Sequence, residues 1–290
     1  MTTESAEPVI AAIDHLLTYV RDGAAAADTF RRLGFTLSPV SQIESMGITN
    51  QMVLFADAAP GTANFIELMS VSDPARLPPP MAALLGGEER IKSMVLSTED
   101  AFRCHAHLAA QGLPFAAPIH VRREWRLDDG TSVHPEFDVI LPQTAGLTFN
   151  ACRYHNVEHY RRPDWTTHPN GVTGLDAALV VAPDPAALAD RFARILHCPV
   201  RRHDGCHIVA AGGVTLDIFA PEDLSTRYGL DMEPPADPLY VGYRLRARDP
   251  AVLAGFARRA DIPVSPAGAG FTLSPAAMYG NLVEVTARAG

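Results

Sequence analysis

The sequence predicts an α+β protein built from four βαβββ modules, each a strand, a helix and three further strands. Three observations support this fold class. A strand-length apolar or alternating run recurs four times, and each run ends at an aspartate that precedes a helix-like pattern. The ends of the modules also match, because in each a small residue precedes a polar or acidic residue by four positions. A repeat of this kind is typical of a fold made from repeated structural units.

The first strand of each module is identified by a seven-residue step to its closing aspartate. The pairs are His15 and Asp22, Ser93 and Asp100, Ala177 and Asp184, and Gly242 and Asp249. Each run has the length and apolar content of a buried strand. Only the first run begins with a side chain that commonly binds metals.

A helix is expected behind each of these aspartates. An N-cap carboxylate accepts hydrogen bonds from the first helical turn, and Asp184 and Asp249 are each followed by proline, which is tolerated at the first helical position. The clearest buried face consists of Leu188, Phe192, Ile195 and Leu196. A glycine or proline closely follows every helical pattern and ends it.

The last strand of each module ends the repeat. The matching pairs are Ala63 and Glu67, Gly146 and Asn150, Gly213 and Asp217, and Gly280 and Glu284. Between the helix and this last strand the chain has room for two more strands, which completes the predicted module.

Proline-rich and polar segments divide the chain into two predicted domains. Residues 74–87 separate the first two modules, and the longest boundary, 154–174, lies near the middle of the chain. We expect modules 1 and 2 in a first domain at 8–155 and modules 3 and 4 in a second at 172–288. A bridging segment at 156–171 joins the two domains.

The composition narrows the classes of function. Hydrophobic residues make up 47% and charged residues 20% of the chain, as in ordinary globular proteins. The net charge of −9 disfavours nucleic acid and anionic membranes as partners. No signal peptide is recognisable, no apolar run approaches the roughly 18 residues of a membrane span, and the four cysteines are scattered. We therefore expect a cytoplasmic protein with reduced thiols.

Nucleotide-binding motifs are absent from the sequence. It contains no Gly-x-Gly-x-x-Gly after a strand, no phosphate-binding Gly-Lys-Ser/Thr loop and no Gly-x-Ser-x-Gly elbow. We therefore expect no nucleotide cofactor.

The fourfold module resembles the vicinal oxygen chelate (VOC) superfamily, which includes glyoxalases, extradiol dioxygenases and bleomycin-resistance proteins. Four segments look more narrowly like its glyoxalase-like domain proteins. They are Ile13-Asp-His15, Gly47-Ile-Thr-Asn50, Phe65-Ile-Glu-Leu68 and His168-Pro-Asn-Gly171. The resemblance covers nearly the whole chain. It implies that modules pair into domains whose curled mixed sheets surround a cleft, and that the first and last strands of each module supply ligands for a divalent metal.

Carried over by position, the resemblance implies His15 and Glu67 as metal ligands in the first domain. Ser93 and Asn150 stand at its other two positions, where the superfamily has His, Gln or Glu, and they are candidates for contact with substrate or water. An imidazole and a carboxylate suit Zn²⁺, Fe²⁺, Mn²⁺ or Ni²⁺. A metal-free interpretation stays open, because His15 and Glu67 would also form a hydrogen-bonded pair in a polar cleft.

The second domain is expected to have a degenerate cleft. Ala177 and Gly242 stand where imidazoles would be needed, and only Asp217 and Glu284 remain. Two acids without carbonyl partners make a poor site even for a hard cation.

Three further residues are candidates for the first cleft. His155, after the last strand, has a side chain that titrates near neutral pH and suits a general base, although a structural role in a loop is the alternative. Arg123 and Trp125 have side chains that can clamp a carboxylate or an aromatic substrate. A solvated strand edge explains the same pair equally well.

The expected function is a divalent-metal-dependent enzyme, a lyase or isomerase or a dioxygenase, with Glu67 and His155 as catalytic residues. Its substrate would be a small carbonyl, enediol or catechol-like molecule. The alternative is a metal-free protein that binds and sequesters a small molecule, as bleomycin-resistance relatives do. Four residues favour it, because each stands where a ligand is expected: Ser93, Asn150, Ala177 and Gly242. Pairing of modules within the chain and pairing across a homodimer both remain open.

Overall fold

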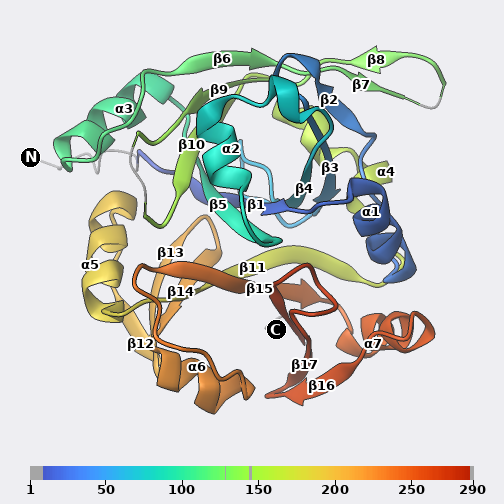
Figure 1. Ribbon diagram of the computed structural model, residues 1–290, viewed down its shortest axis with the longest axis vertical. Helices are drawn as coiled ribbons and strands as arrows, with labels where there is room; N and C mark the ends of the chain where they lie inside the picture. The colour runs from blue at the N-terminus through green and yellow to red at the C-terminus, as the bar shows by residue number, and fades with distance from the viewer. Residues whose placement is uncertain (1–8, 128, 144–145, 288–290) are drawn as a thin grey trace, which may run out of the picture.

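The computed structural model describes residues 9–127, 129–143 and 146–287. Residues 8 and 288, at the ends of the two predicted domains, lie outside this part. The chain forms a ten-stranded sheet followed by an eight-stranded sheet, with helices beside both (Figure 1). The predicted α+β class and its four βαβββ modules are confirmed.

The first sheet contains modules 1 and 2. Module 1 consists of β1 (Ala12–Tyr19), α1 (Gly23–Arg32), β2 (Ser41–Ile43), β3 (Ile48–Leu54) and β4 (Phe65–Val71). Module 2 consists of β5 (Arg90–Ser97), α3 (Ala101–Ala110), β6 (Ile119–Arg122), β9 (Glu136–Ile140) and β10 (Phe149–Tyr154). An inserted hairpin, β7 (Trp125–Arg126) and β8 (Ser132–Val133), pairs through Trp125 with Ser41 of β2.

The second sheet contains modules 3 and 4. Module 3 consists of β11 (Val172–Val181), α5 (Pro185–Leu196), β12 (Arg201–His203), β13 (Cys206–Ala211) and β14 (Val214–Phe219). Module 4 consists of β15 (Leu239–Ala247), α7 (Pro250–Arg259), β16 (Val264–Ala267), β17 (Gly270–Leu273) and β18 (Leu282–Ala287). The connections contain α2 (Pro79–Leu85), α4 (Pro163–Thr166), α6 (Pro221–Tyr228) and the 3₁₀ turns η1 (Glu44–Met46), η2 (Pro74–Arg76) and η3 (Val157–Arg161).

The four repeated aspartates are N-caps, as predicted. The carboxylates of Asp22 and Asp100 each accept two backbone hydrogen bonds from the first turn of the following helix. Those of Asp184 and Asp249 each accept one, ahead of a proline at the start of the helix. Because cap and helix are close in sequence, this part of the fold follows from local chemistry.

The first strands of paired modules lie side by side at the centre of each sheet. β1 pairs with β5 and β11 with β15, both antiparallel. Each also pairs in parallel with the last strand of its own module, as β1 does with β4. The modules therefore pair within the chain, and the candidate ligand positions His15, Glu67, Ser93 and Asn150 lie on the four central strands of the first sheet.

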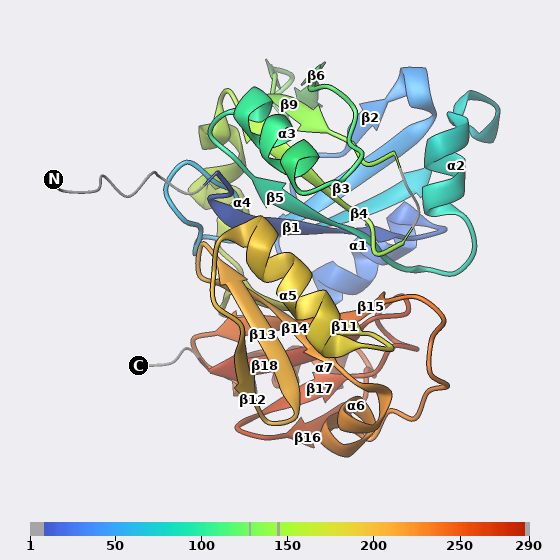
Figure 2. The same cartoon turned by 90° about the vertical axis from the view of Figure 1, so that its left-hand side faces the viewer.

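The two sheets pack back to back around a shared hydrophobic core. One cluster of buried side chains includes Leu16 and Met94 from the first sheet and Ala178 and Tyr243 from the second. Figure 2 shows one sheet above the other. The opposite face of each sheet points away from this core. Among the described residues, no helix has the length and apolar character needed to cross a membrane.

Candidate metal centre

His15 and Glu67 meet on the face of the first sheet that points away from the shared core. They lie diagonally across the parallel strands β1 and β4, because Leu17 is the register partner of Glu67. Nε2 of His15 is 3.8 Å from Oε2 of Glu67, which is too long for a hydrogen bond. Two metal–ligand bonds can bridge such a gap, since together they span up to about 4.2 Å. Both side chains are buried.

Asp14 orients the imidazole of His15. Its Oδ1 is 2.7 Å from Nδ1 of His15, so an ionised Asp14 accepts the Nδ1–H and leaves the lone pair of Nε2 facing Glu67. The register of β1 against β5 shifts between Ile13 and His15, and this irregularity lets two neighbouring side chains meet. A carboxylate behind an imidazole is the usual second contact of a metal-binding histidine.

Asp14 is in turn held by three donors. The Tyr154 hydroxyl donates at 2.8 Å, the Ala63 N–H at 3.0 Å, and the Ser97 hydroxyl donates as well. Burial and the neighbouring Asp14 raise the pKa of Tyr154 well above its usual value. The phenol therefore stays protonated and remains a donor to Asp14.

The other carboxylate oxygen of Glu67, Oε1, already accepts two hydrogen bonds. Oε1 accepts from Nδ2 of Asn50 at 2.6 Å and from Nη1 of Arg123 at 3.2 Å. Burial alone would lower the pKa of Arg123, but the Glu67 carboxylate more than offsets this and raises it. Arg123 therefore stays a charged partner of Oε1, while Oε2 faces His15.

Arg123 and Trp125 are shielded from solvent on the same face of the sheet as His15 and Glu67, and do not form a solvated strand edge. The Arg123 guanidinium lies 4.9 Å from the centre of the Phe137 ring, and Trp125 is completely buried against Tyr160 and Trp165. Among the described residues, neither Nε of Arg123 nor Nε1 of Trp125 has a hydrogen-bond partner. Two buried N–H donors on this face of the sheet are thus unused.

Ser93 and Asn150 form a separate pair. The Ser93 hydroxyl donates to Oδ1 of Asn150 at 2.9 Å. Leu17 is the register partner of Ser93 on β5 and of Glu67 on β4. Leu17 therefore lies between the Ser93–Asn150 pair and the His15–Glu67 pair. The described contacts include none between Ser93 or Asn150 and the His15–Glu67 pair.

A cavity of about 750 Å³ opens beside Ser93 and Asn150. Its apolar walls include Met81 and Leu84 of α2, Leu147 and, from the second domain, Tyr240. Leu85 of α2 packs in one cluster with Leu17, on the cleft side of the sheet. The cavity is therefore adjacent to the His15–Glu67 pair, with Leu17 between them.

His155 does not belong to this site. Successive residues of a strand face opposite sides, and Asn150 and Tyr154 point into the cleft, so Arg153 and His155 point away from it. Nε2 of His155 lies 3.0 Å from Oδ2 of Asp138. This orientation gives no support to the catalytic role predicted for His155. The face of a strand residue is hard to predict, because a one-residue change in strand phase moves its side chain to the other face.

Asp14 and Asn50 were not predicted to have a role, although both lie in segments that carry the family resemblance. Regular alternation places Asp14 on the face opposite to His15, and only the irregularity in β1 brings the two together. Asn50 is the register partner of Met69, two residues beyond Glu67, so its bond to Glu67 depends on strand register.

In the second domain a guanidinium stands between the two acids. Nη2 of Arg244 is 2.7 Å from Oδ2 of Asp217, and its Nε is 2.5 Å from Oε2 of Glu284. Burial would lower the pKa of Arg244, but the two carboxylates overcome this and raise it. The acids that we considered for a hard cation are thus already paired with an arginine.

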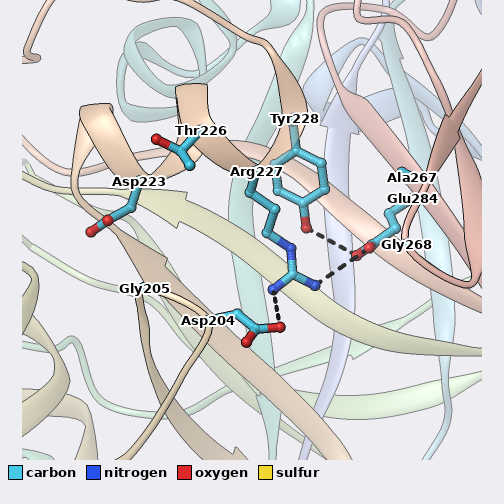
Figure 3. Close-up of a pocket in the computed structure, with 9 residues that line it drawn as sticks. All are labelled: Asp204, Gly205, Asp223, Thr226, Arg227, Tyr228, Ala267, Gly268 and Glu284. Carbon is cyan, nitrogen blue, oxygen red and sulfur yellow. Dashed lines mark hydrogen bonds and ion pairs between the residues drawn. The ribbon is translucent and has the colours of Figure 1, made fainter.

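Further contacts engage Glu284. The Tyr228 hydroxyl donates to Oε2 at 3.0 Å, and Nη2 of Arg227 lies 3.5 Å from Oε1 (Figure 3). Gly242 stands at another of the four candidate ligand positions of the second domain. A Cβ added to Gly242 would lie 1.9 Å from the carbonyl oxygen of Leu282. No side chain fits there while the two strands remain this close.

The comparisons with known proteins agree with this fold. A sequence model for a glyoxalase-like domain matches residues 13–196. A hypothetical protein from Staphylococcus aureus is 12% identical, with a TM-score of 0.64, over 94% of this chain and 98% of that one. The Mn(II)-bound glyoxalase from Novosphingobium aromaticivorans is 11% identical, with a TM-score of 0.60, over 97% and 83%. No curated protein matches the sequence.

A mutant of 4-hydroxymandelate synthase from Streptomyces coelicolor is similar as well. It is 10% identical, with a TM-score of 0.58, over 97% of this chain and 93% of that one. At such low identity these likenesses show a common fold and carry no information on substrate.

Proposed function

The chain belongs to the glyoxalase-like domain family of the VOC superfamily, and on this premise we propose that it is a divalent-metal-dependent enzyme. Its active cleft lies in the first domain. The observation that carries the proposal is the 3.8 Å gap between Nε2 of His15 and Oε2 of Glu67. Nδ1 of His15 and Oε1 of Glu67 are both engaged by neighbouring side chains, which is how metal ligands are commonly held.

The chain's own residues bind and orient the substrate. A divalent ion held by His15 and Glu67 would polarise an oxygen of a small carbonyl, enediol or catechol-like substrate, as in a lyase, isomerase or dioxygenase. The unused N–H groups of Arg123 and Trp125 supply donors for a negatively charged oxygen in a site without bulk water. Glu67 keeps Arg123 in place through the bond to Oε1.

The charges of the buried cluster around His15 explain why a proton would compete with a metal ion. Asp14 and Glu67 carry two negative charges and Arg123 one positive charge, so the cluster with a neutral His15 has one negative charge in excess. A proton on His15 would cancel this charge without any metal. Metal and proton therefore compete for the same nitrogen, and metal affinity should fall as the pH is lowered.

A metal-free binding protein is the second candidate. It is favoured by the cavity beside Ser93 and Asn150, which is large and mostly apolar and does not include His15 or Glu67 among its lining residues. A small amphipathic molecule would fit there, with its polar end against the Ser93–Asn150 pair.

Metal titration separates the two candidates. Isothermal titration with Mn²⁺, Ni²⁺ and Zn²⁺ should show an ion whose binding is lost in His15→Ala and Glu67→Gln. Asp14→Asn, which removes only the orienting carboxylate, should weaken it by about 10–100-fold. Glu44→Gln, a change of the same kind at an exposed acid, is the matched control.

The opposite result is equally informative. Metal stoichiometry that is the same in the wild type, His15→Ala and Glu67→Gln would refute the metal-dependent enzyme. Binding of a small aromatic probe that survives chelator treatment and Glu67→Gln would then support the sequestering protein.

A further inference from the structure

A cluster of two histidines and an aspartate lies on the other face of the first sheet, at its end. His120 of β6 is the register partner of Asp138 of β9, and Asp138 is the partner of Arg153 of β10, two residues before His155. Ligand atoms of His120, Asp138 and His155 all lie within 4.8 Å of one another. The cluster takes no part in the cleft described above.

Strand alternation separates this cluster from the cleft. Phe137 and Val139 of β9 pack in one cluster with Val95 and Cys152 on the cleft side. Asp138 lies between them in the sequence and therefore faces the other side. The cluster is also open to solvent, since the side chains of His120 and His155 are 54% and 30% exposed.

The Asp138 carboxylate stands between the two imidazoles. Oδ1 is 3.0 Å from Nδ1 of His120, and Oδ2 is 3.0 Å from Nε2 of His155. Both carboxylate oxygens of Asp138 thus face an imidazole nitrogen, one on each side.

We propose that His120, Asp138 and His155 form a second metal site, for a borderline divalent ion such as Zn²⁺. Two imidazoles and one carboxylate are the ligand set of open three-ligand zinc sites, in which solvent takes the remaining position. Ca²⁺ and Mg²⁺ are disfavoured because they require mostly oxygen ligands. The proposal does not depend on a metal at His15 and Glu67.

Arg153 competes with a metal for this cluster. Its Nη1 lies 3.2 Å from Nδ1 of His155 and 3.8 Å from Oδ2 of Asp138. Arginine only donates, so without metal Nδ1 of His155 accepts and the Nε2–H donates to Asp138. Metal binding at Nε2 moves this proton to Nδ1, where it faces the Arg153 N–H groups. Arg153 must then turn away, and its side chain, 40% exposed, has room to do so.

The test is a Zn²⁺ titration of the full chain carrying His15→Ala, which removes the first candidate site. We expect one bound Zn²⁺, weakened at least tenfold by His120→Ala or Asp138→Asn, since even changes behind the ligands cost about 10–100-fold. Arg153→Ala should bind more tightly. Arg122→Ala is the matched control, because Arg122 pairs with Glu136 on the same face and touches none of the three ligands.

Other outcomes overturn the proposal. A His15→Ala protein that binds no Zn²⁺, or that binds it equally well after His120→Ala and Asp138→Asn, would refute the site. Equal effects of Arg153→Ala and Arg122→Ala would attribute the change to net charge and refute the competition by Arg153. Histidine NMR signals of the unaltered chain provide a readout that needs no variant. Zn²⁺ should shift those of His120 and His155, and unshifted signals would refute the site.

Failure here and failure of the proposed enzyme are distinguishable. The metal ion that His15→Ala removes belongs to the cleft, and the one that His120→Ala removes belongs to the outer face. Loss of either ion leaves the other proposal standing.

Discussion

Arg123 and Arg244 each pair with an acid at a position where the family has a metal ligand, but they differ in how much of the acid stays available to a metal ion. Arg123 binds one oxygen of Glu67 and leaves the other facing His15. Arg244 binds both Asp217 and Glu284, so the two acids share one guanidinium. A divalent ion would have to displace Arg244, whereas in the first domain it would be held next to Arg123.

Replacement of Arg244 tests whether this one side chain stabilises the buried acids Asp217 and Glu284. Arg244→Met leaves two buried carboxylates without their main counter-charge, and breaking a buried pair in this way costs about 3–5 kcal/mol. Urea unfolding at pH 7 measures the loss. Arg248→Met, on the exposed end of the same strand segment, should change stability by no more than about 0.5 kcal/mol. A loss for Arg244→Met as small as that control would contradict this account.

For single residues, the sequence predicted the positions of His15 and Glu67 but did not predict the side chains that contact them. His15 and Glu67 were found from the repeat, because each stands at a repeated position. The bond between Glu67 and Arg123 spans 56 residues and was not predictable. It depends on how the segment after β6 enters the cleft, which no local pattern encodes.

At the scale of the elements, the four N-caps show what a local pattern can predict. The Asp184 carboxylate accepts from the backbone N–H of Ala187, so the bond lies within one helical turn. Asp184→Ala should therefore destabilise the protein by about 1 kcal/mol, within the usual 0.5–2 kcal/mol for a lost cap. Asp190→Ala, an exposed aspartate inside the same helix, is the control for chemical denaturation. Equal effects at the two positions would rule out the capping role.

Strand phase was less predictable than helix capping. The end of β10 could be located approximately, but a shift of one residue exchanges the faces of Asn150 and His155. His155 was assigned to the cleft because it directly follows this strand, although it contacts Asp138 on the other face.

At the scale of the whole molecule, His168 ties the bridging segment to the first domain. Its Nδ1 accepts from the N–H of Thr36 at 3.0 Å, and its Nε2–H donates to the Leu54 carbonyl at 2.9 Å. The ring is buried between Phe35 and Phe55. Burial lowers the pKa of His168 to about 4 from an ordinary value of 6.5. These contacts give His168 a structural role.

The sign of the resulting pH dependence is fixed. Below pH 6.5 the unfolded chain binds a proton that folded His168 refuses, so stability falls as the pH drops from 6.5 toward 4. The full loss is on the order of 3 kcal/mol. Urea unfolding at pH 7 and pH 5 should show roughly 2 kcal/mol of this loss in the wild type and a smaller difference in His168→Gln. His203→Gln, at an exposed histidine, should keep the wild-type difference; the same difference in His168→Gln would disprove this role.

The four modules, their capping aspartates and the repeated positions of His15 and Glu67 can be read from the amino-acid sequence. These features follow from periodicities and hydrogen bonds that extend over a few residues, so they are readable one segment at a time. Three contacts became visible only in the folded chain: Asp14 orients His15, Arg123 and Arg244 pair with the acids, and His155 joins His120 and Asp138. Each of these contacts depends on strand register or irregularity, or on packing between distant segments, and none of this is present in any single stretch of the chain.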